Sequence, residues 1–376
     1  MTVIAPHAEV AAPQAVDLAS AGLPWLSEGA ISVLGTGSAL PGPPLSTERL
    51  LDQLGPWLGA SERNRASAVA AKLGIATRHS SRPWSTRLAP PSPGCSNPEL
   101  AARAVRAALT EAGVSIWDVG YLIGHTATPA QPMPGNIAFV ADLLGYSGPH
   151  IELRQACTGF ANALMIAFGL LARPDAKPVV IVGSETGSAF LDPERLNIDP
   201  SQIINLVQMG DGAGAILLGP ARRGSERLHS AWYGAMGLHR SPAIELRGDT
   251  ALASATGSGP LQFRHDFRAI LATGRTLFTA GAAAAAAAAH GFDLADADIV
   301  IPHQVSGRIG QQVAEHFDIP VEHVFVNADA VGNTGSAAIW IALHELRGAG
   351  VWPGHAAVVL GAEATKFMHG GFVLAA

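Results

Sequence analysis

Short apolar runs alternate with amphipathic or alanine-rich stretches along most of the chain. Runs rich in Val, Ile and Leu predict buried strands at 30–35, 119–124, 179–183, 214–218, 298–302 and 356–361. Helical spacing or high helix propensity predicts helices at 99–112, 136–144 and 266–290, after Ser306 and through Trp340. Strands and helices that alternate in this way are typical of an α/β fold with largely buried strands.

This alternation divides the chain into two halves. The first half, residues 30–208, opens with a strand that runs into the glycine turn at 35–37, and the second half, residues 209–376, repeats the scheme. Residues 1–29 are rich in Ala and Pro and have few periodic apolar positions, which indicates an N-terminal extension that is loosely ordered or lies over the surface. The Pro-, Ser-, Gly- and Arg-rich stretches 78–98 and 221–260 predict long surface excursions.

No segment predicts a membrane span or a targeting signal. Residues 282–289 are consecutive alanines that end at His290 and Gly291, a pattern that favours a helix able to pack closely against its neighbours. No alanine-rich stretch supplies about 20 apolar residues without a charge or a His. The N-terminus lacks the basic region and the apolar core of a signal peptide. We therefore expect a cytoplasmic protein with no membrane partner.

Composition narrows the function classes further. Of the 376 residues, 48% are apolar and 14% are charged, as in a well-buried globular protein. The formal net charge is −6 and the Lys and Arg residues form no stripe, which argues against a nucleic acid partner. Cys95 and Cys157 are the only cysteines, too few for a disulfide framework and without the spacing of a metal site. One bridge between them is possible by number, but their different surroundings argue against it.

Cys157 stands between a short predicted strand that starts at Ile151 and a predicted helix whose first turn contains small residues. A thiol at such a turn faces the helix N-terminus, where unpaired N–H groups and the helix dipole favour the thiolate. This position predicts a nucleophile. A lone cysteine is more often a small buried hydrophobic residue, however, and Cys95, in a loop with Pro and Gly, is interpreted in that way.

Two further polar residues stand where predicted elements end or begin. His303 follows the predicted strand 298–302, and Asn333 lies in a Gly-rich turn that opens a helix. Side chains at the ends of buried strands gather at the sheet edge where α/β folds place their sites. Each residue alone is a weak signal, because a lone His is more often a satisfied surface or core group.

Five strings in a fixed order carry a stronger signal than these single residues. They are VLGTGSALP, ELRQACTGF, MGDGAGAILL, GFDLADADIVIPHQVSGRI and VGNTGSAAIWIALHEL. Together they resemble the β-ketoacyl-ACP synthase III family of condensing enzymes, from about Ile31 to the C-terminus. The resemblance implies a thiolase fold, a five-layer α-β-α-β-α sandwich of two pseudo-symmetric halves. It also implies a homodimer formed through edge strands.

Carried onto matching positions, the family pattern makes Cys157 the acyl-accepting nucleophile, and His303 and Asn333 the other two members of the catalytic triad. Attack on an acyl thioester forms an oxyanion that needs two N–H donors, and the backbone of Cys157 is one candidate. Loss of CO₂ from a malonyl-type thioester then produces an enolate, to which neutral His303 and the Asn333 amide donate. Neither role needs a metal.

The substrates of such enzymes are carried as thioesters of CoA or of ACP, so the resemblance implies no bound cofactor. Arg308 matches a family arginine near the tunnel mouth, and Arg268 is a weaker match to a carrier-docking position. Both are equally compatible with solvated helix charges. Lys72 stands where an arginine is usual, and Ala68 stands where a tryptophan often stacks on the CoA adenine. These replacements weaken CoA recognition and favour a carrier protein as acyl donor, or CoA bound by other contacts.

The strand end near the C-terminus departs most from the family. Relatives usually have a glycine-rich string there, whose backbone supplies the second oxyanion donor. This chain has LGAEATKFMHGG from Leu360 to Gly371, so Thr365 or Lys366 would have to offer that N–H. Side chains in place of glycines predict an altered acyl pocket.

These features favour an acyltransferase that forms an acyl-enzyme on Cys157 and condenses it with a malonyl- or β-ketoacyl-type thioester in natural-product or specialised lipid biosynthesis. One alternative is transfer of the acyl group to a hydroxyl or amine, for which His303 would serve as base. A third possibility is a non-catalytic partner subunit of a condensing enzyme. Such partners typically lose the nucleophile, and this chain keeps it.

Overall fold

The computed structural model describes residues 24–173, 175–197, 199–222, 225–247, 262–288, 293–350 and 356–375. The strands are β1 (Trp25–Ala39), β2 (Leu45–Ser46), β3 (Thr77–Arg78), β4 (Tyr121–His125), β5 (His150–Leu153), β6 (Val179–Glu185), β7 (Gly212–Pro220), β8 (Arg227–Ala235), β9 (Ile244–Arg247), β10 (Gln262–His265), β11 (Ile299–Pro302), β12 (Ala357–Glu363) and β13 (Met368–Ala375). The helices are α1 (Thr47–Gln53), α2 (Ala60–Leu73), α3 (Asn97–Ala112), α4 (Asn136–Leu144), α5 (Gly159–Leu171), α6 (Ile203–Gln208), α8 (Phe267–Ala288), α9 (Ile309–Phe317), α10 (Ala328–Val331) and α11 (Ala338–Gly348).

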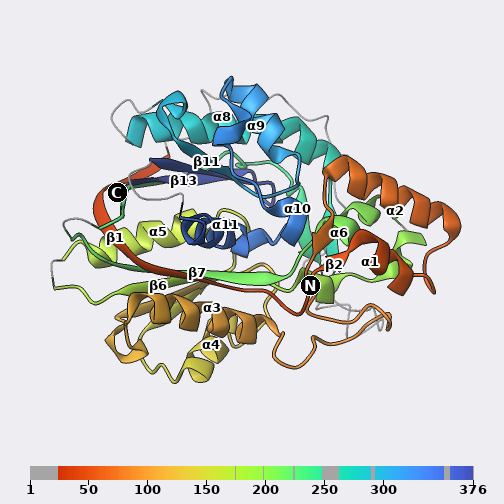
Figure 1. Ribbon diagram of the computed structural model, residues 1–376, viewed down its shortest axis with the longest axis horizontal. Coiled ribbons are helices and arrows are strands. Elements are labelled where there is room, and N and C mark those ends of the chain that lie inside the picture. The colour runs from red at the N-terminus through yellow and green to blue at the C-terminus, as the bar shows by residue number, and fades with distance from the viewer. Residues whose placement is uncertain are drawn as a thin grey trace, which may run out of the picture.

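Helices and sheets stack in five layers (Figure 1). Helices α8 and α9 cover one outer face, and α3 and α4 cover the other. Between them lie two sheet layers, one with β11 and β13 and one with β6 and β7, and α5 and α11 form the middle layer. Three hydrophobic clusters fill the spaces between these layers. The expected α-β-α-β-α sandwich is therefore confirmed.

Strand β1 joins the two sheet layers into one continuous ladder. The strand order is β11-β12-β13-β8-β1-β7-β6-β4-β5. Residues Trp25–Ser32 of β1 pair with β8, and Ile31–Ala39 pair with β7, with register shifts between Glu28 and Ile31 and between Val33 and Gly35. The strand thus begins at Trp25, five residues before the expected start. Residues 1–23, the rest of the expected extension, lie outside the described residues.

The two halves of the sheet repeat one topology. In the first half, β4 is parallel to β6, β6 is antiparallel to β7, and β7 is antiparallel to β1. In the second half, β11 is parallel to β12, β12 is antiparallel to β13, and β13 is antiparallel to β8. Val300 of β11 also makes a parallel bridge to Val324, as β4 pairs in parallel with β5. This repeat is the pseudo-symmetry that the resemblance implied.

Strands β8 and β13 were not anticipated from the sequence. Strand β8 lies inside the stretch 221–260, which was expected to be a surface excursion, yet Leu228, Ala231 and Trp232 on it are fully buried. That expectation was wrong for 227–235, because β8 is covered on both faces and its neighbours come from the two ends of the chain. Residues 248–261 of the same stretch lie outside the described residues.

The middle layer is anchored by three buried aromatic side chains. Phe160 of α5 meets Trp340 of α11 edge-on, with ring centroids 5.9 Å apart, and meets Phe372 of β13 in the same way at 5.8 Å. Trp340 and Phe372 stack at 5.9 Å. Each such pair contributes about 0.5–1.5 kcal/mol beyond the area it buries. Together they fix α5, whose N-terminus carries the candidate nucleophile, against the second half.

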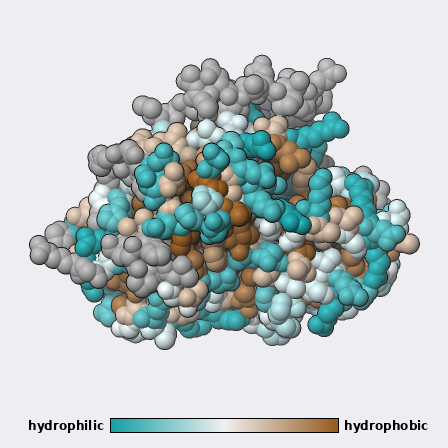
Figure 2. Space-filling model, turned by 45° about the horizontal axis from the view of Figure 1, so that its top comes forward, coloured by the Kyte–Doolittle hydropathy of each residue, from teal (hydrophilic) through white to brown (hydrophobic). Residues whose placement is uncertain are grey.

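Helix α8 contains most of the alanine run and ends at Ala288, close to the expected boundary. Among the described residues it is the one helix long and apolar enough to cross a membrane, a test that the core helix of a folded domain also passes. Thr273, Leu277 and Phe278 on α8 are buried, whereas Leu271 is 82% exposed. Figure 2 shows polar residues around a central apolar patch on the face seen there.

Candidate active site

Cys157 lies at the turn between β5 and α5, as the sequence predicted. Strands β4, β5 and β6 are parallel, so their carboxyl ends meet at one edge of the sheet and the turn stands at that edge. Cys157 as a whole residue is partly exposed, but its thiol is desolvated, and Ala156, Thr158 and Gly159 around it are buried. Both cysteines are free, so the alternative of a bridge to Cys95 is wrong.

The N-terminus of α5 is occupied by a carboxylate from the second half. Oε2 of Glu363, at the end of β12, accepts hydrogen bonds from the Thr158 N–H at 2.8 Å and the Thr158 hydroxyl at 2.7 Å. Glu363 is 2% exposed. The Thr365 hydroxyl donates to its other oxygen. The donors at the start of the helix therefore face Glu363.

This arrangement reverses the electrostatic expectation for the nucleophile. Burial, followed by the negative charges of Glu363 and Glu185, raises the pKa of the Cys157 thiol well above its ordinary value. The sequence argument that the helix N-terminus favours the thiolate was wrong here, because it left out carboxylates that arrive from distant strands. Cys157 is held as a thiol, so a base or the departing group has to take its proton.

Glu185, at the end of β6, is the second carboxylate beside the nucleophile. It accepts hydrogen bonds from the Ala127 N–H at 3.0 Å, from the Ser336 N–H at 3.3 Å, and from the hydroxyls of Thr128 and Ser336. Burial raises its pKa despite these donors. The Ser336 hydroxyl also lies 3.2 Å from the Gln155 carbonyl oxygen, which ties the Asn333 turn to the Cys157 turn.

His303 directly follows β11, the strand next to β12. Its backbone N–H donates a hydrogen bond to the Leu360 carbonyl at 2.8 Å, which extends the β11–β12 pairing to the histidine. The side chain is 2% exposed, and its Nδ1 has no hydrogen-bond partner among the described residues. Burial lowers the pKa of His303 to about 4, so the imidazole is neutral at pH 7 and has one N–H to donate.

Asn333 lies in the turn that leads into α11. Its backbone is held by the Gln208 carbonyl and the Gly210 N–H, at 2.8 and 3.0 Å. Its side-chain oxygen accepts the Gly335 N–H at 3.0 Å, so the amide NH₂ points the other way and can donate to a substrate. Gly183 of β6 packs directly against the turn that follows Asn333. A Cβ at Gly183 would lie 2.2 Å from the Ser336 carbonyl oxygen, so the two halves of the chain can approach this closely only with glycine there.

Pseudo-symmetry brings the three sequence-predicted residues to one place. Cys157 precedes the middle helix α5, and Asn333 precedes its counterpart α11 through the short turn at 335–337. His303 follows β11, the counterpart of β4. The Gln155–Ser336 contact joins the first two turns, and the Thr158–Glu363 contact joins the Cys157 turn to the strand beside His303. The roles of these three residues stay predictions.

The remaining sequence-predicted site residues lie around this centre. Thr365 sits in the turn between β12 and β13, where its hydroxyl bonds Glu363. Arg308 is exposed and lies against Gly74, where a Cβ would be 3.3 Å from Nε, and exposed Lys72 is two residues away on α2. Arg268 is exposed in the first turn of α8. Lys72 and Arg308 are thus brought near one another, and among the described residues no hydrogen bond or ion pair joins Arg268 to them.

Sequence reasoning missed the polar groups that surround the nucleophile. Gln155 donates to the Tyr233 hydroxyl at 3.1 Å and to the Thr158 hydroxyl at 3.0 Å, and Tyr233 lies 2.9 Å from the Met368 sulfur. In the sequence, Glu363 stood out only as part of the string from Leu360 to Gly371, which departs from the glycine-rich family pattern. Its acidic side chain in that string was the one available signal, because the family pattern has no acid there.

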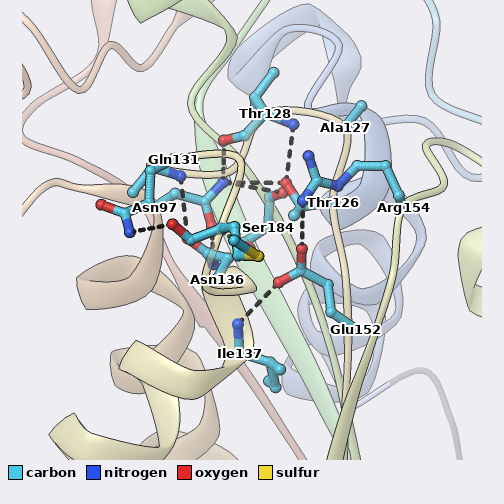
Figure 3. Close-up of polar contacts among 12 residues, drawn as sticks. Asn97, Thr126, Ala127, Thr128, Gln131, Asn136, Ile137, Glu152, Arg154 and Ser184 are labelled. Carbon is cyan, nitrogen blue, oxygen red and sulfur yellow. Dashed lines mark hydrogen bonds and ion pairs between the residues drawn. The ribbon is translucent and has the colours of Figure 1, made fainter.

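A pinned segment, residues 126–137, leads from β4 into α4 beside the edge strand β5 (Figure 3). Asn97 holds it through Thr126 and Thr128, at 3.1 and 2.8 Å, and Asn136 donates to Asn97 at 2.7 Å. Glu152 of β5 accepts the Ile137 N–H at 2.8 Å. Between these fixed ends, Met133 is 84% exposed.

Among the described residues, no three His, Cys, Asp or Glu side chains gather to hold a metal ion.

Two family models match the chain. The model described as 3-oxoacyl-[acyl-carrier-protein (ACP)] synthase III matches residues 151–237, and the model of the C-terminal part of that enzyme matches residues 287–374. The first match contains Cys157. The second contains His303, Asn333 and Thr365.

Relatives and solved structures agree with these matches. The beta-ketoacyl-[acyl-carrier-protein] synthase III of Deinococcus deserti is 31% identical over 254 residues, 66% of this chain and 68% of the relative. The enzyme of the same name from Rhodospirillum centenum is 29% identical over 325 residues, 83% of this chain and 88% of the relative.

Three solved structures cover nearly the whole fold. AbyA1, a tetronic acid condensing enzyme, superposes with a TM-score of 0.78 and 27% identity, covering 92% of this chain and 100% of its own. The 3-oxoacyl-(acyl carrier protein) synthase III of Pseudomonas aeruginosa superposes with a TM-score of 0.77 and 27% identity, covering 92% and 98%. The priming beta-ketosynthase of the R1128 polyketide pathway reaches 0.73 at 25% identity, covering 94% and 98%.

Proposed function

Because the chain belongs to the β-ketoacyl-[acyl-carrier-protein] synthase III family of condensing enzymes, an acyltransferase class, we propose that Cys157 accepts an acyl group and passes it to a second thioester by Claisen condensation. One observation carries this proposal. On one side of Cys157, the Gln155 carbonyl accepts a hydrogen bond from Ser336 of the Asn333 turn, and on the other side the Thr158 N–H donates to Glu363 of the strand beside His303.

In the first half-reaction, the Cys157 sulfur bonds to the acyl carbon as the donor's carbon–sulfur bond breaks. The thiol proton leaves with the donor's thiol, directly or through neutral His303, whose low pKa keeps it able to accept a proton at pH 7. The carbonyl oxygen becomes an oxyanion on the way. The backbone N–H groups of Cys157 and Thr365 are the proposed donors to it.

In the second half-reaction, a malonyl-type thioester loses CO₂, or a β-ketoacyl-type thioester loses a proton, and becomes a carbon nucleophile. Its enolate oxygen accepts hydrogen bonds from the imidazole N–H of His303 and the side-chain NH₂ of Asn333. The carbanion then bonds to the acyl carbon as the carbon–sulfur bond to Cys157 breaks, and the released thiolate takes up a proton from solvent to restore the thiol. The free direction of the Asn333 amide and the neutral state of His303 support these donor roles.

The acyl donor is a thioester of CoA or of an acyl carrier protein, and the proposal includes no bound cofactor. Arg308 and Lys72 form a basic region at the junction of α2 and the loop after His303, which suits a carrier phosphate or an acidic carrier protein. Arg268 on α8 is a further proposed carrier contact. The proposed setting is the cytoplasm.

A role in natural-product or specialised lipid assembly is also part of the proposal. The likeness to a tetronic acid condensing enzyme and to a polyketide priming ketosynthase supports it. The altered strand end adds a second argument. The stretch that contains Glu363 and Thr365 carries side chains where the family pattern is rich in glycine, which suits an acyl pocket of different shape beside Cys157.

Acylation can be tested by mass spectrometry of the intact protein after incubation with a panel of acyl-CoA and acyl-carrier thioesters. We expect a mass increase equal to the acyl group in the wild type and in Cys95→Ala, and none in Cys157→Ala. Cys95 is the matched control because it is the other free cysteine of the chain. An adduct that survives Cys157→Ala, or no adduct with any donor, would refute the acyl-enzyme and favour a non-catalytic partner subunit.

A second candidate function is transfer of the acyl group to a hydroxyl or amine. The observation in its favour is the neutral His303, which suits a general base for an acceptor as well as an enolate donor. Asn333 has no evident use in that reaction, and its free amide therefore favours condensation.

A further inference from the structure

Glu363 brings a buried negative charge to the nucleophile from the other half of the molecule. It lies 205 residues from Thr158 in the sequence, yet it takes both the N–H and the hydroxyl of that residue at 2.8 and 2.7 Å. The Thr365 hydroxyl donates to it as well. All three groups donate, so Glu363 acts as an acceptor through both oxygens, as an ionised carboxylate does.

The charges that act on Cys157 share one sign. Among the described residues, Glu363 and Glu185 are the charged groups that shift the thiol's pKa, and both shift it upward. His303 is neutral at pH 7. The Cys157 turn therefore stands in a negative field, and its partly desolvated surroundings strengthen that field.

We propose that Glu363 is a specificity-determining residue that excludes anionic acyl groups from Cys157 and admits neutral ones. An acyl chain that ends in a carboxylate, such as succinyl, would bring a further negative charge to the Cys157 turn, on which Glu363 and Glu185 already act. Like charges in a site of low polarity repel strongly. This inference rests on the proposed function for its substrates, but the field itself exists without any substrate.

The bond changes are those of ordinary thioester exchange. The Cys157 sulfur–carbon bond forms, the donor carbon–sulfur bond breaks, and the thiol proton leaves with the donor's thiol. Glu363 takes no part in these changes. It acts on the energy of a charge carried by the incoming acyl group.

A pair of alkylating reagents measures the field directly. Iodoacetamide and iodoacetate both form a carbon–sulfur bond with loss of iodide, and they differ mainly in the negative charge of iodoacetate. The ratio of their rates at Cys157, divided by the same ratio at Cys95 in the same sample, cancels the intrinsic reactivity of the reagents. We expect the normalised ratio to favour iodoacetamide over iodoacetate by at least about tenfold in the wild type. This factor corresponds to a difference of about 1.4 kcal/mol in activation free energy.

Glu363→Gln removes the charge and keeps the contacts. The glutamine oxygen can accept both Thr158 donors, and its NH₂ can donate to the Thr365 hydroxyl. We expect the normalised ratio to fall at least threefold in this variant, with Glu185 responsible for what remains. Glu322→Gln, which removes an exposed carboxylate away from the site, should leave the ratio unchanged.

The outcomes separate the two proposals. If the rate ratio of the two reagents at Cys157 equals the ratio at Cys95 in the wild type, the inference is overturned, whether or not Glu363→Gln folds. It is also overturned if Glu363→Gln folds and has the same normalised ratio as the wild type. If acyl adducts form on Cys157, monomethylsuccinyl thioesters should also outpace succinyl thioesters at least tenfold in the wild type, and less so in Glu363→Gln. Absence of all acyl adducts refutes the proposed function and leaves the alkylation result standing.

Discussion

The nucleophile Cys157 and the imidazole of His303 are both neutral at rest. Burial lowers the pKa of His303 to about 4, and burial with two carboxylates raises that of Cys157. At pH 7 the pair is therefore a thiol and an imidazole, and no ion pair is prepared in advance. The proton must move during acylation, which makes the enzyme's first step dependent on correct placement of a thioester.

Asn333 should separate the two half-reactions. In Asn333→Ala, acylation of Cys157 should continue at close to the wild-type rate, because the amide donates only to the second substrate. Condensation should fall about 10²–10³-fold, the usual cost of one lost donor to a developing oxyanion. Single-turnover acylation and product analysis by mass spectrometry measure the two steps. Full acyl transfer to an alcohol by this variant, with no carbon–carbon product, would identify an acyltransferase to heteroatoms.

In the part of the chain that the structure describes, strand β5 pairs with a neighbouring strand on one side only. It ends the nine-stranded sheet next to β4, and Ile151 on it is 38% exposed. An open edge strand invites pairing with another chain, and a two-fold axis would pair β5 with its own copy. Met133, in the pinned segment 126–137 whose end is bonded to Glu152 of β5, is 84% exposed. These features support the proposed homodimer.

Ile151→Lys should convert the dimer to a monomer, because it places a charge at the centre of the paired edge. Leu238→Lys is the control, since Leu238 is 81% exposed on the turn after β8, in the other half of the sheet. Sedimentation velocity at several protein concentrations measures the change. A wild type that sediments as a monomer throughout, or an Ile151→Lys variant that stays dimeric, would contradict pairing through β5.

The whole molecule buries several histidines in their neutral form. His125, His303 and His369 are each at most 3% exposed, and burial lowers their pKa values to about 3, about 4 and about 4. His125 accepts the Trp340 indole N–H at 3.0 Å, which links the two halves. Protonation of these imidazole rings is therefore less favourable in the folded chain than in the unfolded chain.

Acid should therefore weaken the fold well above pH 4. The folded pKa values lie below the unfolded value of 6.5, so stability is full above pH 6.5 and falls as the pH drops toward 4. Each such histidine costs up to about 1.4 kcal/mol per pH unit in that window. His369→Gln should lose less stability than the wild type between pH 6.5 and pH 4.5, by about that amount per unit. Urea unfolding at several pH values measures this difference.

His239→Asn, which changes an exposed histidine away from β5, should keep the wild-type pH dependence. Equal slopes for the wild type and His369→Gln would show that burial of this ring does not govern the acid response.

Local pattern alone was enough for the elements whose neighbours along the chain determine them. Helix α4 begins and ends at the expected residues, and α3 and β6 start within two residues of expectation. The strings around Cys157, His303 and Asn333 likewise identified the family before any fold was known. Strand β8 escaped prediction because its neighbours β1 and β13 come from opposite ends of the chain.

The state of Cys157 was decided by the tertiary structure. Sequence reasoning assigned the thiol to a helix N-terminus and expected the thiolate, which is what α5 by itself would favour. Folding brings Glu363 and Glu185 to the same place from β12 and β6, and their charges act across space rather than along the chain. The sequence by itself pointed to Cys157 as the candidate nucleophile. Only the packing of the folded chain determined that two carboxylates lie beside its thiol.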